Sequence, residues 1–293
     1  MNVQTEYDVL SRVLMCEASS ITEQYSALQN LLTQQGVNIV QMPHTPGLEA
    51  QEFTRDVGFV IGHVLFSGHL SRQHRKAETK AFQQYLEQHH LAFVPLTNPI
   101  EGGDVLVHGP YVFVGLGSRT TEAGVNELRR HLGPAYHVFG FPYDGSRFLH
   151  LDSLFNIISP TQALCYQAAF QPSSLQTLQS LFSQIYPVTS STEQANLALN
   201  VLNLGNKTMI MPAGNPQTAR MLRNHGFTVL ETNLQEFVSA RGGPRCLTLP
   251  LLRTTTRTGS RSIPRMTESS YENVTWLIIM AVFVIMAARV LRI

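Results

Sequence analysis

Apolar and polar positions recur along most of this chain at a fixed interval. Four segments, each an apolar strand, a turn and a second apolar strand, begin at Asp56, Asp104, Asp152 and Asn200, so each begins 48 residues after the one before. Each pair of strands precedes a stretch with helical spacing of apolar residues and then one further short strand. The pattern predicts a repeated ββαβ unit, whose apolar face needs neighbours of the same kind.

A fifth unit is divided between the two ends of the repeating region. Residues 246–252 form an apolar strand with no helix after it, whereas residues 8–17, 23–35 and 37–42 have the patterns of a strand, a helix and a closing strand. Pairing of the two ends would complete the unit. The sequence therefore predicts an α/β fold, a five-unit ββαβ propeller closed by pairing of its N- and C-terminal segments.

The C-terminal end has a different pattern. Residues 253–272 are rich in Ser, Thr and Arg, and residues 273–290 contain the uncharged run NVTWLIIMAVFVIMAA. Its length is on the short side for a bilayer span of about 17 to 25 residues, and a buried or re-entrant helix is the alternative. We predict a propeller domain (1–252), a linker and one C-terminal transmembrane anchor. The arginines before the run outnumber those after it, which predicts a membrane protein whose propeller domain is cytoplasmic.

Composition excludes other classes of function. The 293 residues are 43% hydrophobic with a formal net charge of +1, which allows a sizeable core but gives no basic excess for nucleic acid. Three cysteines, Cys16, Cys165 and Cys246, have no spacing typical of a zinc knuckle or a redox pair. The histidines of residues 63–90 fit no metal-binding spacing either. We therefore predict no metal and no cofactor.

Equivalent positions of a rotationally repeated fold lie around one axis, so the repeat also predicts a site. Asp56, Glu101, His150 and Cys246 lie at or just before the repeat position. A thiol beside an imidazole is an activated nucleophile, because a charged imidazole lowers the thiol pKa. Surrounding carboxylates suit a planar cation such as a guanidinium, whose N–H groups bind carboxylates in a fork.

Five motifs occur in a characteristic order: FTRD (53–56), EGGD (101–104), VGLGSRT (114–120), HLDSLF (150–155) and RGGPRCLTLPL (241–251). With them the chain resembles the guanidine-modifying enzymes, that is, dimethylarginine dimethylaminohydrolases, arginine deiminases and amidinotransferases. The resemblance implies the five-unit fold called a pentein. It also implies a hydrolase that converts the guanidino group of arginine or N-methylated arginine to a ureido product such as citrulline. Some motifs are similar to those of dimethylarginine hydrolases and others to those of deiminases, so the substrate stays open.

The resemblance implies roles for single residues. Cys246 would attack the guanidinium carbon, His150 would protonate the leaving amine and then activate water, and Glu101 would support His150. The implied substrate-binding residues are Asp56 and Asp152 for the guanidinium, Arg75, Arg119 and Arg241 for the α-carboxylate, and Phe53 of the first motif. Arg245 is expected to lower the pKa of its neighbour Cys246.

Two alternatives to a hydrolase stay open at this stage. In an amidinotransferase an amine would replace water in the second half-reaction, and a pentein without catalysis would be a binding module. Retention of the thiol, the imidazole and the carboxylates favours an enzyme. The expected partners are a small guanidino substrate and a membrane, and self-association stays open.

Overall fold

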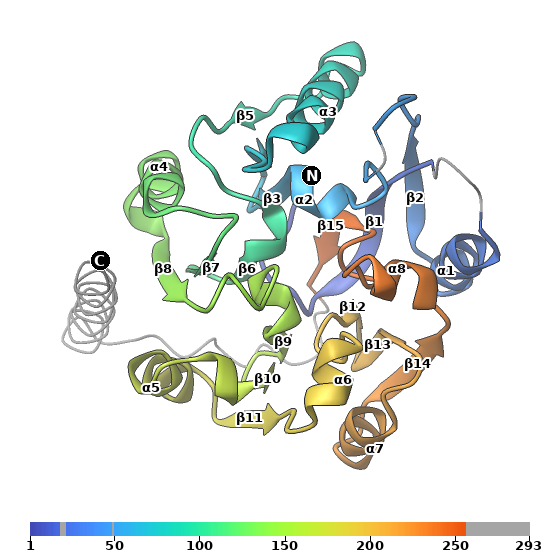
Figure 1. Cartoon of the computed structure of the whole chain (residues 1–293), viewed down its shortest axis with the longest axis vertical. Helices are drawn as coiled ribbons and strands as arrows, with labels where there is room; N and C mark the ends of the chain where they lie inside the picture. Colours follow the sequence, from blue (N-terminus) through green and yellow to red (C-terminus); the bar gives the residue numbers. More distant parts are fainter. Residues whose placement is uncertain (18–21, 49, 256–293) are drawn as a thin grey trace.

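The strands of the protein form five small sheets around a central axis (Figure 1). A computed structural model describes residues 1–17, 22–48 and 50–255. Within these residues each sheet has three strands, and its middle strand pairs antiparallel with one neighbour and parallel with the other. An antiparallel hairpin, a helix and a parallel closing strand make up each unit, as the pattern predicts.

Four units follow one another along the chain. The first comprises β3 (Gly58–Ile61), β4 (Val64–Ser67), α3 (Lys76–Gln88) and β5 (Val94–Pro95). The second comprises β6 (Val105–His108), β7 (Tyr111–Leu116), α4 (Glu122–Leu132) and β8 (His137–Pro142). The third comprises β9 (Phe155–Ser159), β10 (Gln162–Cys165), α5 (Pro172–Leu181) and β11 (Gln184–Pro187). The fourth comprises β12 (Leu202–Gly205), β13 (Thr208–Pro212), α7 (Pro216–Asn224) and β14 (Thr228–Thr232).

The fifth unit joins the two ends of the propeller. It contains β15 (Leu249–Thr254), β1 (Val9–Cys16), α1 (Glu23–Gln34) and β2 (Asn38–Met42). β1 pairs antiparallel with β15, with Val9 opposite Thr254, and parallel with β2. The predicted five-unit ring, closed by its terminal segments, is therefore confirmed.

The main helices cover the outside of the ring (Figure 1), and their sequences explain where they begin and what they bury. Thr22 and Thr121 cap α1 and α4, since each hydroxyl accepts a backbone N–H of the first turn. Val125 and Leu128 of α4 are fully buried. Burial of such apolar stripes between helix and sheet supplies the core.

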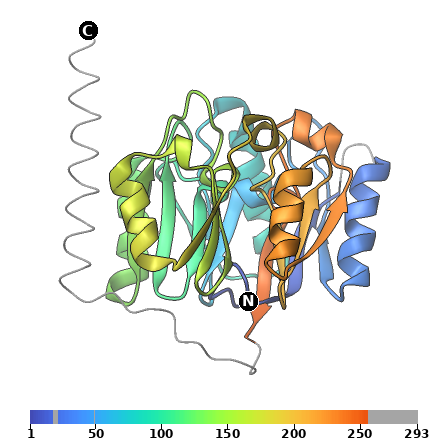
Figure 2. The same ribbon diagram turned by 90° about the horizontal axis from the view of Figure 1, so that it is seen from below.

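Short helical segments precede the hairpins and bring the repeat positions to the axis. Asp56 lies in α2 (Thr54–Val57), while Asp104 and Asp152 lie in the equivalent 3-10 turns before β6 and β9. α6 (Ser191–Ala195) and α8 (Gln235–Ser239) lie on the same face of the ring (Figures 1 and 2). The N-terminus lies on the opposite face, near the middle of the ring (Figure 2).

The predicted transmembrane anchor and the membrane location have to be corrected. α3, with 13 residues, is the longest described helix, and none of the described helices is long and apolar enough to cross a bilayer. Residues 273–290 and most of the predicted linker lie outside the described residues. The anchor and the location inferred from it are withdrawn.

Candidate active site

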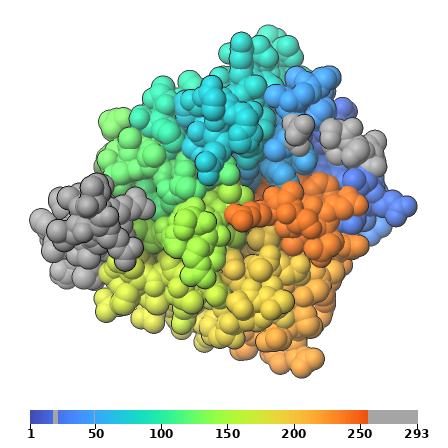
Figure 3. Space-filling view, viewed as in Figure 1, coloured from blue at the N-terminus to red at the C-terminus, as the bar shows by residue number. Residues whose placement is uncertain are grey.

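A cavity of about 220 Å³ lies at the axis, on the face formed by the short helical segments. Figure 3 shows the segments near residues 150 and 240 meeting over the middle of this face. Seven predicted site residues line the cavity: Phe53, Asp56, Arg75, Arg119, His150, Arg241 and Cys246. The other two, Glu101 and Asp152, contact His150 and Cys246 respectively. The structure therefore brings all nine together.

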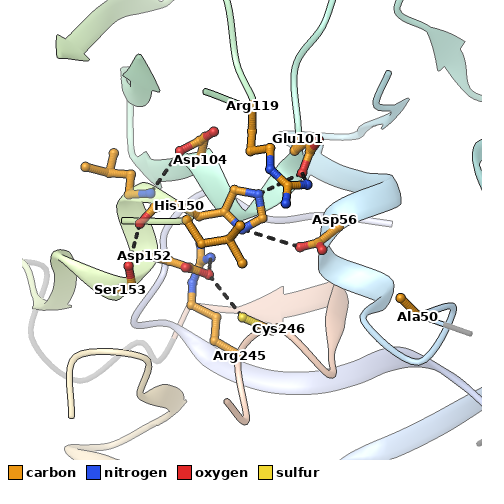
Figure 4. A network of polar contacts seen from close by, with 12 residues as sticks. Ala50, Asp56, Glu101, Asp104, Arg119, His150, Asp152, Ser153, Arg245 and Cys246 are labelled. Atoms are coloured by element: carbon orange, nitrogen blue, oxygen red, sulfur yellow. Dashed lines mark hydrogen bonds and ion pairs between the residues drawn. The ribbon is translucent and has the colours of Figure 1, made fainter. Parts of the chain in front are cut away.

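His150 lies between two carboxylates (Figure 4). Its Nε2 is 2.8 Å from Oε2 of Glu101, and its Nδ1 is 3.7 Å from Oδ1 of Asp56. Burial opposes a charge on the ring, but these carboxylates and Asp104 outweigh it and raise the pKa of His150 to about 10. We call Asp56, Glu101, Asp104 and His150 the acidic shell. At neutral pH its imidazole is protonated and can donate a proton.

Glu101 is held from several sides. Its Oε1 accepts the backbone N–H and the hydroxyl of Ser71, at 3.0 and 3.1 Å. Burial opposes its charge, but the contact with His150 and the nearby Arg119 outweigh burial and lower the pKa of Glu101 to about 2. A Cβ at Gly103 would come within 2.5 Å of the His150 ring, so the EGGD motif needs glycine where the two meet.

Cys246 follows the turn of the RGGPRC motif. Its Sγ is 3.2 Å from Nδ2 of Asn200 and 3.8 Å from Oδ2 of Asp152. Burial raises the pKa of the Cys246 thiol well above its usual value, and Asp152 and Asp56 add to this effect. Arg245 acts in the expected direction, lowering that pKa, but it is outweighed. The thiol is therefore protonated when the cavity holds no cation.

Arg75 is bound to acidic residues within the protein. Its Nη1 is 2.7 Å from Oδ2 of Asp56, and its Nε and Nη2 bind Glu78. Both edges of the guanidinium are thus occupied, which suits a residue that positions Asp56 better than one that grips a substrate carboxylate. The other oxygen of Asp56 accepts no hydrogen bond from the described residues and is buried. This oxygen faces Nδ1 of His150 at 3.7 Å, too far for a hydrogen bond, and its hydrogen-bonding capacity is left for a ligand.

Arg119 and Arg241 lie where the cavity widens. Both also line an adjoining cavity of about 610 Å³. Nη1 of Arg119 is 3.4 Å from Glu101, whereas Arg241 is exposed and makes no ion pair among the described residues. Arg241 has a φ of 65°, a strained conformation for a residue other than glycine. Its neighbour Gly242 packs so closely on the Phe53 ring that a Cβ would clash, which explains the RGG sequence.

Two contacts were not predicted as part of the site. Asn200, at the fourth repeat position, also accepts the backbone N–H of Arg245 through Oδ1 at 3.1 Å. Asp104 accepts the backbone N–H of Leu151 at 2.9 Å, which fixes the residue after His150. Burial raises the pKa of Asp104 to about 6. The repeat itself was the signal for both, because they share the phase of Asp56.

Among the described residues, the acidic shell also has the geometry of a possible metal site. Asp56, Glu101 and His150 each offer one ligand atom, and these atoms lie within 4.8 Å of one another. A protonated imidazole has no free lone pair for a metal, however. At neutral pH the raised pKa of His150 keeps the imidazole protonated, so a metal ion at this place would have to displace that proton.

Comparisons with known proteins agree with this geometry. The sequence model described as N,N dimethylarginine dimethylhydrolase, eukaryotic, matches residues 12–253. The chain belongs to this family. It is 31% identical to the uncharacterized protein YkgA of Bacillus subtilis over 274 residues, which cover 85% of this chain and 94% of YkgA. It is 29% identical to an arginine deiminase of Mycobacterium marinum over 241 residues, 69% of this chain and 60% of the deiminase.

Solved structures share the fold. The N-terminal domain of ArgZ, an arginine dihydrolase from cyanobacteria, superposes with a TM-score of 0.76 at 24% identity, covering 83% of this chain and 98% of that domain. SxtG, an amidinotransferase from Microseira wollei, gives a TM-score of 0.73 at 18% identity, with 90% and 99% covered. The family thus places the chain among guanidine-modifying enzymes, and its characterised relatives include amidine hydrolases.

Proposed function

We propose that this protein hydrolyses the guanidino group of arginine or of an N-methylated arginine, leaving a ureido product. The observation that carries the proposal is one cavity lined by Cys246, His150 and Asp56, whose Oδ1 accepts no hydrogen bond from the described residues. A thiol, a protonated imidazole and an unsatisfied acceptor are the groups that covalent hydrolysis of a guanidinium needs. Membership of the dimethylarginine hydrolase family supports the same chemistry.

Binding of a cation would change the charge of the thiol. Burial keeps Cys246 protonated, and the carboxylates that add to this effect, Asp152 and Asp56, are also the ones that a guanidinium would contact. A positive substrate beside the sulfur offsets their effect and lowers the thiol pKa. The proton leaves to solvent, and the thiolate forms only when the substrate is in place.

The first half-reaction joins the sulfur to the substrate. The Cys246 thiolate attacks the guanidinium carbon, a C–S bond forms, and the protonated His150 gives its proton to the departing nitrogen. The C–N bond breaks, and ammonia or a methylated amine leaves. The products of this step are a thiouronium bound to Cys246 and a neutral imidazole.

The second half-reaction restores the enzyme. Neutral His150 takes a proton from water, the water oxygen bonds to the thiouronium carbon, and the C–S bond breaks to return the thiolate. Glu101 stabilises the imidazolium in both halves through its 2.8 Å contact. The ureido product is formed with one extra proton and gives it up. This proton replaces the one that the Cys246 thiol lost at the start, so the thiolate returns to the thiol.

The test uses the full-length protein with arginine, monomethylarginine, asymmetric dimethylarginine and agmatine, each assayed for ureido product. We expect turnover of at least one α-amino acid substrate and its loss in Cys246→Ser. Cys165→Ser is the matched control, because Cys165 is also buried but lies in β10, outside the cavity. Absence of ureido product with all four compounds would overturn the proposal, and a new guanidino product on addition of glycine or ornithine would reassign it to amidino transfer.

A further inference from the structure

Behind Cys246 lies a second group of buried charges, which the proposed mechanism does not use. Three arginines from different parts of the chain, Arg55, Arg245 and Arg253, are each at most 3% exposed. The carboxylate of Glu6, itself 4% exposed, is close to two of them: Oε1 is 3.2 Å from Nη2 of Arg245, and Oε2 is 3.9 Å from Nη2 of Arg55. We call Glu6 and these three arginines the basic cluster.

Glu6 is fixed at this place by the backbone. Its N–H donates to the carbonyl of Val107 at 3.0 Å, and the N–H of Val107 donates back to Oε1 of Glu6 at 3.2 Å. The N-terminal segment forms bridges to three units in all, through Asn2 with Leu252, Val3 with Gly62 and Thr5 with His108, the last in the same unit as Val107. The segment therefore ties units together on the face opposite the cavity and carries one acidic side chain to the axis.

The basic cluster connects to the nucleophile through Arg245. Nη1 of Arg245 is 2.8 Å from Oδ2 of Asp152, and that same oxygen is 3.8 Å from Sγ of Cys246. Nη2 of the guanidinium contacts Glu6 and also donates to the carbonyl of Val105 at 2.9 Å. Arg245 thus binds two carboxylates, that of Glu6 and that of Asp152, which lies beside the sulfur.

We propose that Glu6 is a positioning residue for the thiol, acting across the axis by holding Arg245 and so limiting how far Arg245 neutralises Asp152. This inference rests on the proposed function for its effect on turnover, but its effect on the sulfur needs no substrate. Buried carboxylates that lie between arginines set both the geometry and the charge of what those arginines contact.

The direction of the effect follows from charge. The charged groups close to the sulfur or Arg245 are Asp152, Asp56, Arg55, Arg253 and Glu6, and His150, Arg75, Arg119 and Arg241 line the same cavity as the sulfur. In Glu6→Gln one negative charge disappears while all the positive ones stay. Arg245 is then balanced by Asp152 alone, so the surroundings of Cys246 become more positive and the thiolate is favoured. The same neutralised Asp152 binds a cationic substrate less well.

The experiment measures the pH dependence of alkylation of Cys246 by iodoacetamide in the full-length protein, read by mass spectrometry of the peptide that contains Cys246. We expect Glu6→Gln to shift the midpoint downward by about half a pH unit or more. With a guanidino substrate KM is expected to rise by about threefold or more with a smaller change in kcat. Glu193→Gln is the matched control, because Glu193 is equally buried at 4% exposure but binds the backbone N–H groups of Gln217 and Thr218 in α7, not Arg245.

An unchanged midpoint in folded Glu6→Gln, or an equal shift in Glu193→Gln, would overturn the inference. If Glu6→Gln does not fold, Glu6→Asp decides, since it keeps the charge but withdraws it from Arg245 by one methylene; a downward shift supports the role and an unchanged midpoint rejects it. A midpoint shift in a protein that turns over none of the guanidino substrates would refute the proposed function and leave the positioning role intact.

Discussion

The acidic shell and the basic cluster differ in sign, although both are buried at the axis. In the acidic shell three carboxylates face one imidazole, and in the basic cluster three guanidinium groups face one carboxylate. Cys246 lies between them, in contact with Asp152, which itself binds Arg245. The buried thiol therefore has mainly negative charge on one side and mainly positive charge on the other.

The two groups affect the thiol unequally. Its pKa is raised although Arg245 is close, because burial and the carboxylates Asp152 and Asp56 outweigh the arginine. A substrate cation entering the cavity adds positive charge on the side where it is lacking. The comparison shows that burial and the nearby carboxylates outweigh the basic cluster and keep the resting thiol protonated.

Loss of the thiol should have the largest effect. Cys246→Ser keeps the size of the side chain but replaces a good nucleophile by a poor one, and we expect the rate of ureido formation to fall by about 1,000-fold or more. Unfolding in urea should change by no more than about 1 kcal/mol, because both side chains are small. A rate within tenfold of the parent protein would show that the sulfur does not form the covalent bond.

Breaking the acidic shell should have the next largest effect. Glu101→Gln removes the carboxylate that stabilises the imidazolium of His150, so the pKa of His150 falls and kcat should drop by about 100-fold. The alkaline limb of the kcat/KM profile should move to lower pH. Glu127→Gln provides the control, since Glu127 is also a buried carboxylate but binds Thr97 and Asn98. An alkaline limb at the same pH in Glu101→Gln as in the parent protein would mean that Glu101 does not raise the pKa of His150.

Much of the acidic shell could be predicted from the sequence, because its members follow the repeat. Asp56 and Asp104 share one phase, while Glu101 and His150 precede it by a few residues. A rotational repeat places equal phases at equal distances from the axis, so a one-dimensional pattern becomes a three-dimensional cluster. Arg75 shows the limit of this reasoning, since its pairing with Asp56 depends on how α3 packs and not on phase.

The basic cluster could not be predicted in this way. Glu6 lies before the first repeated strand, and its partners Arg55, Arg245 and Arg253 have no common phase. They meet only because the ring closes and the N-terminal segment crosses it. The transmembrane prediction rested on the apolar run, the polar linker before it and the flanking arginines; none of the described helices supports it, and residues 273–290 lie outside the described part of the chain.

Arg75 and Arg119 offer a sharper comparison, because Arg75 is held by Asp56 and Glu78 whereas Arg119 has one longer contact, to Glu101 at 3.4 Å. Arg119→Ala should lower kcat/KM for arginine by about tenfold while leaving agmatine nearly unchanged, because agmatine has no carboxylate for Arg119 to bind. Arg75→Ala should impair both compounds, since it releases Asp56. Steady-state kinetics with the two substrates tests this difference. Equal losses for arginine and agmatine in Arg119→Ala would mean that Arg119 acts through Glu101 and not through the substrate.

The last prediction concerns the folding stability and its dependence on pH, with no effect on turnover required. The folded-state pKa of His150 is about 10, above the 6.5 of the free side chain, so its contribution to stability is complete below pH 6.5 and is lost as the pH rises towards 10. The lowered pKa of Glu101 is the other side of the same contact, and that contribution is lost only as the pH falls from 4.5 through about 2. Between pH 7 and pH 10 the parent protein should therefore lose about 3 kcal/mol more unfolding free energy than His150→Gln, measured by urea denaturation at each pH. Parallel pH profiles would mean that the imidazole is neutral in the fold, and the acidic shell would then lack the proton that the first half-reaction requires.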